Sequence, residues 1–372
     1  DDEAEPRHAN SEGIVFANTT RAAATPSSPA AVDAIEVCRP GLLTTIQDRG
    51  RHGHAAIGVS PAGALDEVAL HLANALVGNP GDAAALEITL VGPTLHFPQA
   101  ALIALCGADP DARVDGVTVP VWRPVLLAAG STLVCGSLRH GARSVLAIAG
   151  GIRVPPVLDS RSTDLNARLG PFDGRALMTG DRLPCAAAPR TLCRALWRRH
   201  DAACLSGSRS MRVFAPSWWI NPTNWFDVNP ARPIQLVAGS HFTLLDATSR
   251  RALLGDEFRI ARDSNRVGAR LNGPRLALRE PVELVSTGVP LGTLQLPPGG
   301  QPIALLAEHP TTGGYPRIAH VARIDLPRLA QRRPGDALRF ALIDLDEAWL
   351  RWQRRERALT VLTNHIRYRL RE

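Results

Sequence analysis

The chain has 372 residues, of which 45% are hydrophobic and 21% are charged, and its formal net charge at pH 7 is +7. This composition is typical of a soluble globular protein, and the length allows two packed cores. All 42 basic residues are arginine, which excludes a biotinylated lysine, a Schiff-base lysine and the lysine of a P-loop. Aromatic residues make up only 5%, too few for a nucleic-acid stacking platform, so the basic charge favours anionic small substrates.

The chain's first segment and its cysteines and histidines point to a cytoplasmic protein without a metal. Residues 1–33 are rich in Asp, Glu, Ala, Ser, Thr and Pro, and they predict a disordered N-terminal tail with no secretory signal. The apolar runs are far shorter than the roughly 20 residues that cross a bilayer. The six cysteines form no C-x-x-C pair and the histidines show no ligand spacing, so no metal site is predicted.

From residue 34 onward, short apolar segments separated by Gly and Pro predict a mainly β protein with a few short helices. Strands are expected at residues 102–108, 125–136, 143–150, 234–238, 283–286, 291–296, 302–307, 318–324 and 338–343. Apolar spacing and early acidic residues predict helices at 65–77 and 345–370. Asn74 is expected to face solvent, and the docking stripe of the last helix is expected to comprise Ala348, Trp349, Trp352, Leu359, Leu362 and Ile366.

A faint internal repeat indicates two β domains of similar topology. Gly-Pro-x-Leu, Gly-Gly and Gly-Asp follow one another in the same order in both halves of the chain. We therefore expect a first domain at 34–210, a second at 211–344 and a C-terminal helix at 345–372. The seam between the domains is expected in the irregular stretch 184–211.

Four segments are denser in Gly, Thr, Asn, Asp and Arg than a scaffold requires, namely 40–66, 159–165, 263–268 and 308–316. In the last of them, Gly313 and Gly314 expose backbone N–H groups beside the hydroxyls of Thr311 and Thr312. Such a nest can hold an oxyanion without any lysine. The alternative is an ordinary β-turn capped by the two hydroxyls.

Charged residues in these segments offer further chemistry. Arg51, Arg161 and Arg266 could each clamp a carboxylate through two hydrogen bonds, or could form structural ion pairs. Glu308 lies at the end of a strand directly before the glycine turn, a suitable place for a general base.

Two more carboxylates have alternative interpretations. Glu87 lies in an apolar stretch, so it either pairs with an arginine or has a raised pKa. Asp66 could take part in the chemistry or could only cap its helix.

Long motifs from these segments occur in one order along the chain: PGLLTTIQDRGR, GVSPAGALDEVALHLANALVGN, ALEITLVGPTL, AGGIRVPPVLDSRSTD and TTGGYPRIA. Together they resemble the biotin-dependent carboxyltransferase family, which includes KipA-like proteins, allophanate hydrolase subunit 2 and the C subunit of 5-oxoprolinase. The resemblance implies two cyclophilin-like β-barrel domains, corresponding to subdomains A and B. It also implies as partner a KipI-like protein, similar to the B subunit of 5-oxoprolinase, and possibly a LamB/YcsF-like A subunit.

The same resemblance implies an ATP-dependent complex that opens 5-oxoproline to L-glutamate, with the ATP contacts shared among its proteins. For such a reaction we predict Asp66, Glu308, Thr312 and Tyr315 as catalytic residues. We predict that the substrate-binding residues are Arg51, Ser160, Arg161, Arg266, Thr311, Gly313 and Gly314.

Two other functions stay open at this point. One is a carboxyltransferase component that uses carboxybiotin from a separate carrier, as in urea carboxylase, since biotin cannot be attached to this chain. The other is a non-catalytic, KipA-like regulatory protein. Two departures from the family pattern favour the regulator: Asn265 stands where Asp is usual, and Pro310 where Gln is often found. Glu308 also stands where Asp is common.

Overall fold

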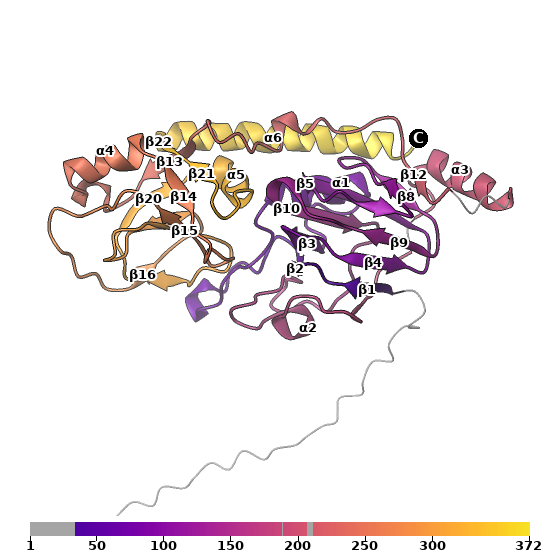
Figure 1. Ribbon diagram of the computed structural model, residues 1–372, viewed down its shortest axis with the longest axis horizontal. Coiled ribbons are helices and arrows are strands. Elements are labelled where there is room, and N and C mark those ends of the chain that lie inside the picture. The colour runs from indigo at the N-terminus through magenta and orange to yellow at the C-terminus, as the bar shows by residue number, and fades with distance from the viewer. Residues whose placement is uncertain (1–33, 188, 207–210) are drawn as a thin grey trace, which may run out of the picture. The chain divides into compact units, whose positions relative to one another are not determined.

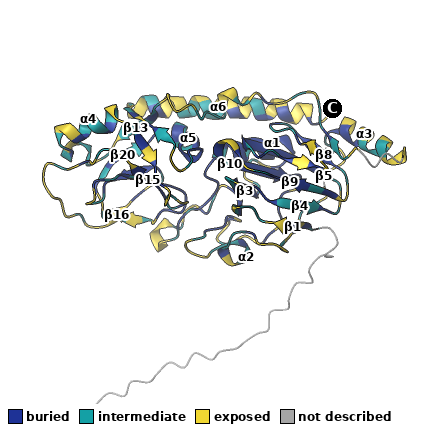
Figure 2. Ribbon diagram, viewed as in Figure 1, coloured by how far each residue is buried: buried dark blue, intermediate teal, exposed yellow. Residues whose placement is uncertain are grey.

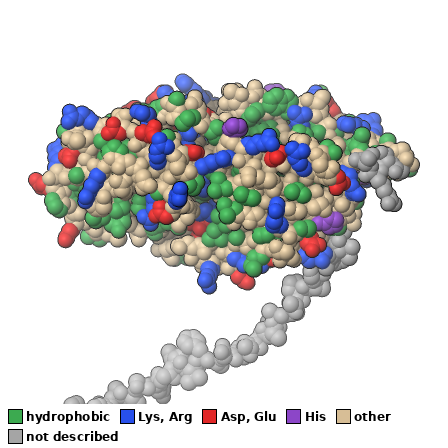
Figure 3. Space-filling model, viewed as in Figure 1, with side chains coloured by type: hydrophobic (Ala, Val, Ile, Leu, Met, Phe, Trp, Pro, Cys, Tyr) green, Lys and Arg blue, Asp and Glu red, His purple; other side chains and the backbone are tan. Residues whose placement is uncertain are grey.

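A computed structural model describes residues 34–187, 189–206 and 211–372. The predicted tail at 1–33 lies outside the described residues. The described chain is mainly β with a few helices, as predicted (Figure 1). Among these residues, no helix combines the length and the apolar character needed to cross a membrane. Arginine side chains are scattered over the visible face (Figure 3).

The first half of the fold contains two six-stranded antiparallel sheets. The first has the order β11 (Arg182–Leu183), β1 (Ile35–Arg39), β4 (Thr94–Phe97), β9 (Ser131–Val134), β6 (Arg113–Val114) and β7 (Val117–Thr118). The second has the order β12 (Val213–Phe214), β8 (Val125–Leu127), β5 (Ala101–Asp109), β10 (Arg139–Ile148), β3 (Ala85–Thr89) and β2 (Leu43–Gln47).

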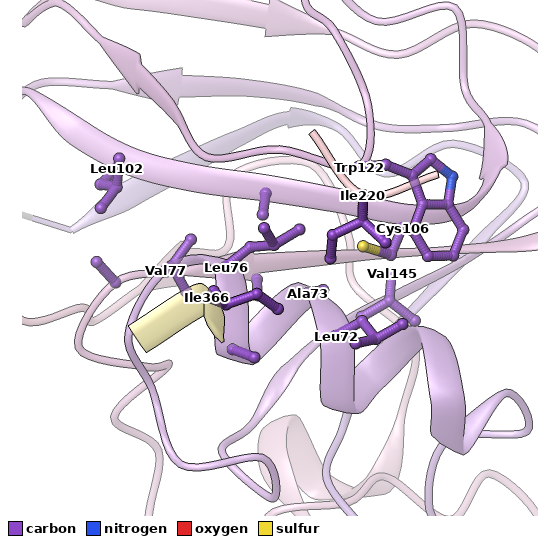
Figure 4. Close-up of a cluster of buried hydrophobic side chains, with 14 of the residues drawn as sticks. Leu72, Ala73, Leu76, Val77, Leu102, Cys106, Trp122, Val145, Ile220 and Ile366 are labelled. Atoms are coloured by element: carbon purple, nitrogen blue, oxygen red, sulfur yellow. The ribbon is translucent and has the colours of Figure 1, made fainter. Parts of the chain in front are cut away.

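Strand β5 shows why the second sheet is a middle layer. Successive side chains of a strand point to opposite faces. Leu102 and Cys106 belong to the same buried hydrophobic cluster as Leu72 of helix α1 (Glu67–Leu76), and Figure 4 labels all three. Ile103 and Leu105 instead join the core that lies against the first sheet. The continuous apolar run that predicted this strand therefore reflects burial on both faces.

The second half is built on an eight-stranded sheet that nearly closes into a barrel. Its order is β21 (Ala337–Leu338), β14 (Phe258–Ile260), β15 (Gly268–Asn272), β18 (Ile303–Leu305), β17 (Thr293–Gln295), β20 (Arg317–Val321), β13 (Ile234–Ala238) and β22 (Phe340–Leu342). Strands β21 and β22 form the two ends of the sheet, yet only Arg339 separates them in the chain. The two edges therefore meet, which is how a barrel removes its open edges.

The remaining elements are helices and one short strand pair. Strand β16 (Thr287–Gly288) pairs with β19 (Thr312–Gly313). The other α-helices are α2 (Pro171–Gly174), α3 (Arg194–Leu205), α4 (Ala247–Gly255), α5 (Leu326–Ala330) and α6 (Leu345–Arg369), and the 3-10 helices are η1 (Ala55–Ile57), η2 (Pro222–Asn224), η3 (Phe242–Leu244) and η4 (Arg323–Asp325). Helix α6 contacts α1 of the first half and η4 of the second, so it connects both halves (Figure 1).

Several expectations about the elements were wrong. The segment 125–136 is two strands in different sheets, because the chain turns at Gly130, whose φ is 73°. Residues 283–286 form no strand. The stretch 184–211, expected to be irregular, contains α3. The segment 318–324 leaves its strand at Val321 and continues into η4.

Two side-chain expectations were also wrong. Trp349 is 54% exposed and lies outside the buried stripe of α6, which Figure 2 shows in alternating colours. Asn74 is fully buried, and its amide Nδ2 donates to the carbonyl oxygen of Ala83 at 2.8 Å. The expected domain boundary between 210 and 211 stays a proposal. Strand β12, just after it, pairs with β8 of the first half.

Candidate functional site

A buried cluster of charges joins the two halves at Arg266. Its guanidinium Nε and Nη1 donate to Glu308 and Glu87, and its Nη2 donates to the carbonyl oxygen of Gly63 at 2.6 Å. The other oxygen of Glu87 accepts the backbone N–H of Leu65 at 2.7 Å. Of the two possibilities for Glu87, pairing with an arginine is confirmed. Because every guanidinium nitrogen has a protein partner, Arg266 has the geometry of a residue that holds the halves together.

Glu308 lies inside this cluster, and its side chain is 2% exposed. Burial raises the pKa of its carboxyl group, while the positive charge of Arg266 and the backbone N–H of Leu165 oppose that change. Its own backbone N–H donates to the carbonyl oxygen of Arg266 at 2.9 Å. A general base needs to reach a substrate proton, and Glu308 lines neither of the two cavities described below.

Asp48, at the end of β2, ties together two of the loops that the sequence singled out. Its carboxylate accepts hydrogen bonds from Gly50 N–H at 2.7 Å and from the hydroxyls of Ser160 and Ser162, each at 2.6 Å. The backbone N–H of Arg161 also donates to it at 2.6 Å. The Ser160 hydroxyl is therefore committed to Asp48 and is buried. Asp48 was not among the predicted site residues, although it is an acidic residue directly after a buried strand and two residues before Gly50.

A polar cavity of about 400 Å³ opens beside these loops. It is lined by 48–50, by 150–153 around the Gly-Gly pair, and by Asp159 and Arg161. The Arg161 Nε donates to the carbonyl oxygen of Val154 at 2.8 Å, and within the described residues its two terminal nitrogens have no partner. They remain available to an anionic ligand.

The rim of this cavity carries backbone strain. Leu158 and Asp159 adopt φ values of 51° and 61°, in the left-handed region. A bulky residue such as Leu rarely adopts that conformation, which costs on the order of 1–3 kcal/mol and is often found at functional sites. The sequence did not indicate these positive φ angles, because such angles are usually signalled by glycine and neither residue is a glycine. Three arginines and three aspartates line the cavity, namely Arg49, Arg153, Arg161, Asp48, Asp82 and Asp159.

Arg51 is buried behind the cavity, with only 1% of the residue exposed. Its Nη2 donates to the carbonyl oxygen of Ser162, but its Nε and Nη1 are buried with no hydrogen-bond partner among the described residues. Burial lowers the pKa of the guanidinium, and the charges of Asp164 and Asp48 oppose that change. Arg51 therefore sits among the carboxylates that connect the loops, and it does not line the cavity.

The Thr-Thr-Gly-Gly segment lies elsewhere. Thr312 pairs with Gly288 in the short β16–β19 ladder, and the Thr311 carbonyl accepts the Val289 N–H at 3.1 Å. A Cβ at Gly313 would lie 2.5 Å from the side-chain amide nitrogen of Gln295, so a larger residue there would displace that side chain. Thr312 and Gly313 are thus part of an extended strand pair, and among the described residues neither threonine hydroxyl caps a turn.

The end of this segment lines a second cavity, of about 670 Å³. Gly314 and Tyr315 contribute to its wall together with apolar residues such as Leu276, Leu284 and Leu296, and Tyr315 is 46% exposed. Among the described residues, no hydrogen bond or ion pair joins 311–315 to any of the three predicted arginines. The structure therefore pairs Arg266 with Glu308, buries Arg51 apart from that pair with a hydrogen bond to Ser162, and places Arg161 at a polar cavity and the hairpin at another.

Asp66 caps helix α1. Its Oδ1 accepts the Ala69 N–H at 2.9 Å, which confirms the capping alternative. Its Oδ2 accepts the side-chain amide of Gln331 at 2.7 Å, a contact across 265 residues of sequence that no local pattern indicated. Burial raises the pKa of Asp66 to about 6.

Asn265 has a local role. Its Oδ1 accepts the backbone N–H groups of Val267 at 2.9 Å and Gly268 at 3.3 Å, and so forms the turn that precedes β15. An amide oxygen serves this turn as well as a carboxylate oxygen does. The replacement of Asp by Asn is therefore compatible with an intact turn beside Arg266. In the part of the chain that the structure describes, no group of three or more His, Cys, Asp or Glu side chains is arranged to hold a metal.

Known proteins are similar to this chain in sequence and in fold. The family described as "Carboxyltransferase domain, subdomain A and B" matches residues 57–342. The C subunit of 5-oxoprolinase from Escherichia coli is 38% identical over 314 residues, which are 84% of this chain and 93% of that protein. The crystal structure of Kluyveromyces lactis urea carboxylase matches with a TM-score of 0.76 and 27% identity, covering 90% of this chain and 29% of that one. The crystal structure of TTHA0988 matches with a TM-score of 0.69 and 33% identity, and this chain covers 85% of its own length but only 56% of that protein.

Proposed function

This chain belongs to the family of carboxyltransferase domains with subdomains A and B, and from that membership we propose that it is the C subunit of an ATP-dependent 5-oxoprolinase. In this proposal the assembled complex opens the ring amide of 5-oxoproline and releases L-glutamate. The observation that carries the proposal is the likeness to the Escherichia coli C subunit, because it extends over 93% of that protein. The similarity therefore extends over nearly the whole length of the Escherichia coli protein and is not limited to one part of it.

We assign the polar cavity to the carboxylate of the substrate. The free terminal nitrogens of Arg161 can form two parallel hydrogen bonds to a carboxylate, and Arg49 and Arg153 line the same cavity. A volume of about 400 Å³ is within the usual range for small-molecule sites. Arg51, Arg266 and Ser160 support this site indirectly, because they hold the surrounding loops and the two halves in place.

An alternative within this proposal places the ring amide at the Thr-Thr-Gly-Gly hairpin, whose end lines the second cavity and not the cavity that contains Arg161. The ring oxygen of 5-oxoproline gains negative charge as the amide is activated. The backbone N–H groups of Gly313 and Gly314, with the hydroxyls of Thr311 and Thr312, are suited to stabilise such an oxygen. Tyr315, at the rim of the second cavity, is a candidate proton donor. Glu308 and Asp66 have raised pKa values, but Glu308 is paired with Arg266 and Asp66 caps α1, so both have a structural role in this proposal.

The complex supplies what this chain lacks. We propose a KipI-like B subunit as its partner, a LamB/YcsF-like A subunit as a third component, and ATP bound through contacts shared among them. A cytoplasmic setting would supply the ATP. No nucleic acid, membrane or covalently attached biotin enters this scheme.

Reconstitution tests the proposal. The chain is purified with its candidate B and A subunits, and L-glutamate and ADP are measured with and without 5-oxoproline. We expect glutamate and ADP to form together, and only when all three proteins are present. ATP turnover that ignores 5-oxoproline, or activity that persists without this chain, would contradict the proposal.

A second candidate function is a carboxyltransferase component that accepts the carboxyl group of carboxybiotin from a separate carrier. The likeness to Kluyveromyces lactis urea carboxylase, with a TM-score of 0.76, favours it. The same purified proteins distinguish the two functions. Turnover that requires a biotinylated carrier and bicarbonate would support the second candidate, whereas turnover in their absence would support the first.

A further inference from the structure

Helix α3 carries a cysteine, a histidine and an aspartate in contact with one another. The Sγ of Cys204 lies 3.7 Å from Nε2 of His200, and the other ring nitrogen, Nδ1, lies 3.1 Å from Oδ1 of Asp201. Cys204 and His200 are four residues apart and so lie on the same face of the helix. The thiol is exposed. This group lies outside the motifs that the proposed function uses.

The imidazole of His200 is held in one orientation. Its ring meets those of Trp197 and Phe214 edge to face, with centroids 5.7 and 5.6 Å away. The guanidinium of Arg190 bonds to the second oxygen of Asp201 and lies over the Trp197 ring. With its Nδ1–H donated to Asp201, the ring presents the lone pair of Nε2 to the thiol. The nucleophile Cys204 thus contacts the base His200, and His200 is oriented by its hydrogen bond to Asp201.

The other cysteines differ in exposure or in surroundings. Cys106, Cys135 and Cys193 are buried, and burial raises the pKa of each of these thiols. Cys38, on β1, is exposed like Cys204 but has no polar side-chain partner among the described residues. The chain therefore contains its own control: two exposed thiols, of which one has an oriented base.

We propose that Cys204 is a covalent modification site for small electrophiles, with His200 as the base that activates its thiol. The sulfur lone pair forms a bond to the electrophilic carbon, and the leaving group departs with the electron pair of the bond that breaks. The thiol proton passes to Nε2 of His200. Asp201 stabilises the imidazolium that results. No oxidant or cofactor is required.

The test is competitive alkylation of the full chain with iodoacetamide at pH 7, followed by peptide mass mapping over time. We expect Cys204 to react about tenfold faster than Cys38, an increase within the range that oriented bases give to cysteines. In His200→Gln, the rate at Cys204 should fall to within about twofold of the rate at Cys38, which should not change. Equal rates at the two cysteines of the unmodified protein would overturn the proposal.

Two further variants keep the test decisive. Arg354→Gln changes an exposed residue of α6, and it should leave both rates unchanged. Cys193 precedes α3 and is buried, so its protection from iodoacetamide reports whether α3 is intact. If Cys193 becomes reactive in His200→Gln, the variant Asp201→Asn is used in place of His200→Gln. If α3 is intact in the variant used and the alkylation rate of Cys204 is unchanged, His200 is not the base.

Discussion

The buried arginine cluster and the Thr-Thr-Gly-Gly hairpin are both conspicuous in the sequence, but the structure uses them differently. Arg266 is 4% exposed and all of its guanidinium nitrogens are bound by protein atoms from both halves. Thr312 is exposed and belongs to a two-residue strand. An arginine in a motif rich in polar residues can thus hold the two halves of the fold together, whereas the exposed hairpin remains accessible to a ligand. Arg161 combines features of both, with one bound nitrogen and two free ones.

The largest effect is expected from Arg266→Met. Removal of the guanidinium leaves two buried carboxylates, Glu87 and Glu308, without their partner. The cost of such an unpaired buried charge is about 3–5 kcal/mol in the free energy of unfolding, measured by urea denaturation.

The matched control for that variant is Arg270→Met. Arg270 pairs with Asp263, but both side chains are more than half exposed. Solvent screens such a pair, so the expected loss is below about 1 kcal/mol. If Arg266→Met lowers the free energy of unfolding by as little as Arg270→Met does, the cluster does not hold the halves together.

A smaller effect, dependent on pH, is expected at Asp66. Its pKa in the folded protein is about 6, above the unfolded value of about 3.9. The folded state therefore binds more protons between these values, and the free energy of unfolding falls as pH rises through 6. Between pH 5 and pH 8 this group should remove on the order of 1 kcal/mol of stability.

The variant Asp66→Asn isolates that dependence, because Asn can still cap the helix. The quantity to compare is the difference between the two proteins in unfolding free energy at pH 5 and at pH 8. It should shift in favour of the variant as pH rises. A difference that is constant with pH would show that Asp66 does not titrate in this range.

The smallest effect on stability is expected from Thr312→Val. The side chain is exposed, and exposed substitutions usually change the free energy of unfolding by no more than about 0.5 kcal/mol. If the hydroxyl stabilises the ring oxygen, however, kcat of the reconstituted complex should fall by about tenfold or more. Loss of stability above about 2 kcal/mol with unchanged kcat would reverse the roles given to the hairpin and the cluster.

Local patterns predicted the fold well and the long-range contacts poorly. The apolar spacing around Leu72 identified helix α1, and the run around Leu105 identified β5, because burial of one or both faces leaves a periodic signal. The arginine-rich helix α3 was missed, because few of its residues are buried and its apolar pattern is weak.

The candidate site shows the same limit. An arginine partner for Glu87 was foreseen as one of two possibilities, but its identity was not, because Arg266 is 179 residues away. Gln331 was missed for the same reason, since its partner Asp66 lies 265 residues away along the chain. The Thr-Thr-Gly-Gly segment was predicted as either an oxyanion nest or a capped turn, and neither alternative indicated its pairing with β16 or its separation from the arginines.

The most direct measurement is the KM for 5-oxoproline of a reconstituted complex that contains Arg161→Gln. Loss of a charge-assisted carboxylate contact of about 1.5–3 kcal/mol raises KM by about 10- to 100-fold, while the thermal midpoint stays near that of the unmodified protein. The control variant Arg113→Gln, at a half-exposed ion pair, should leave KM unchanged. An unaltered KM in Arg161→Gln, with the protein folded and active, would contradict the assignment of the polar cavity to the substrate.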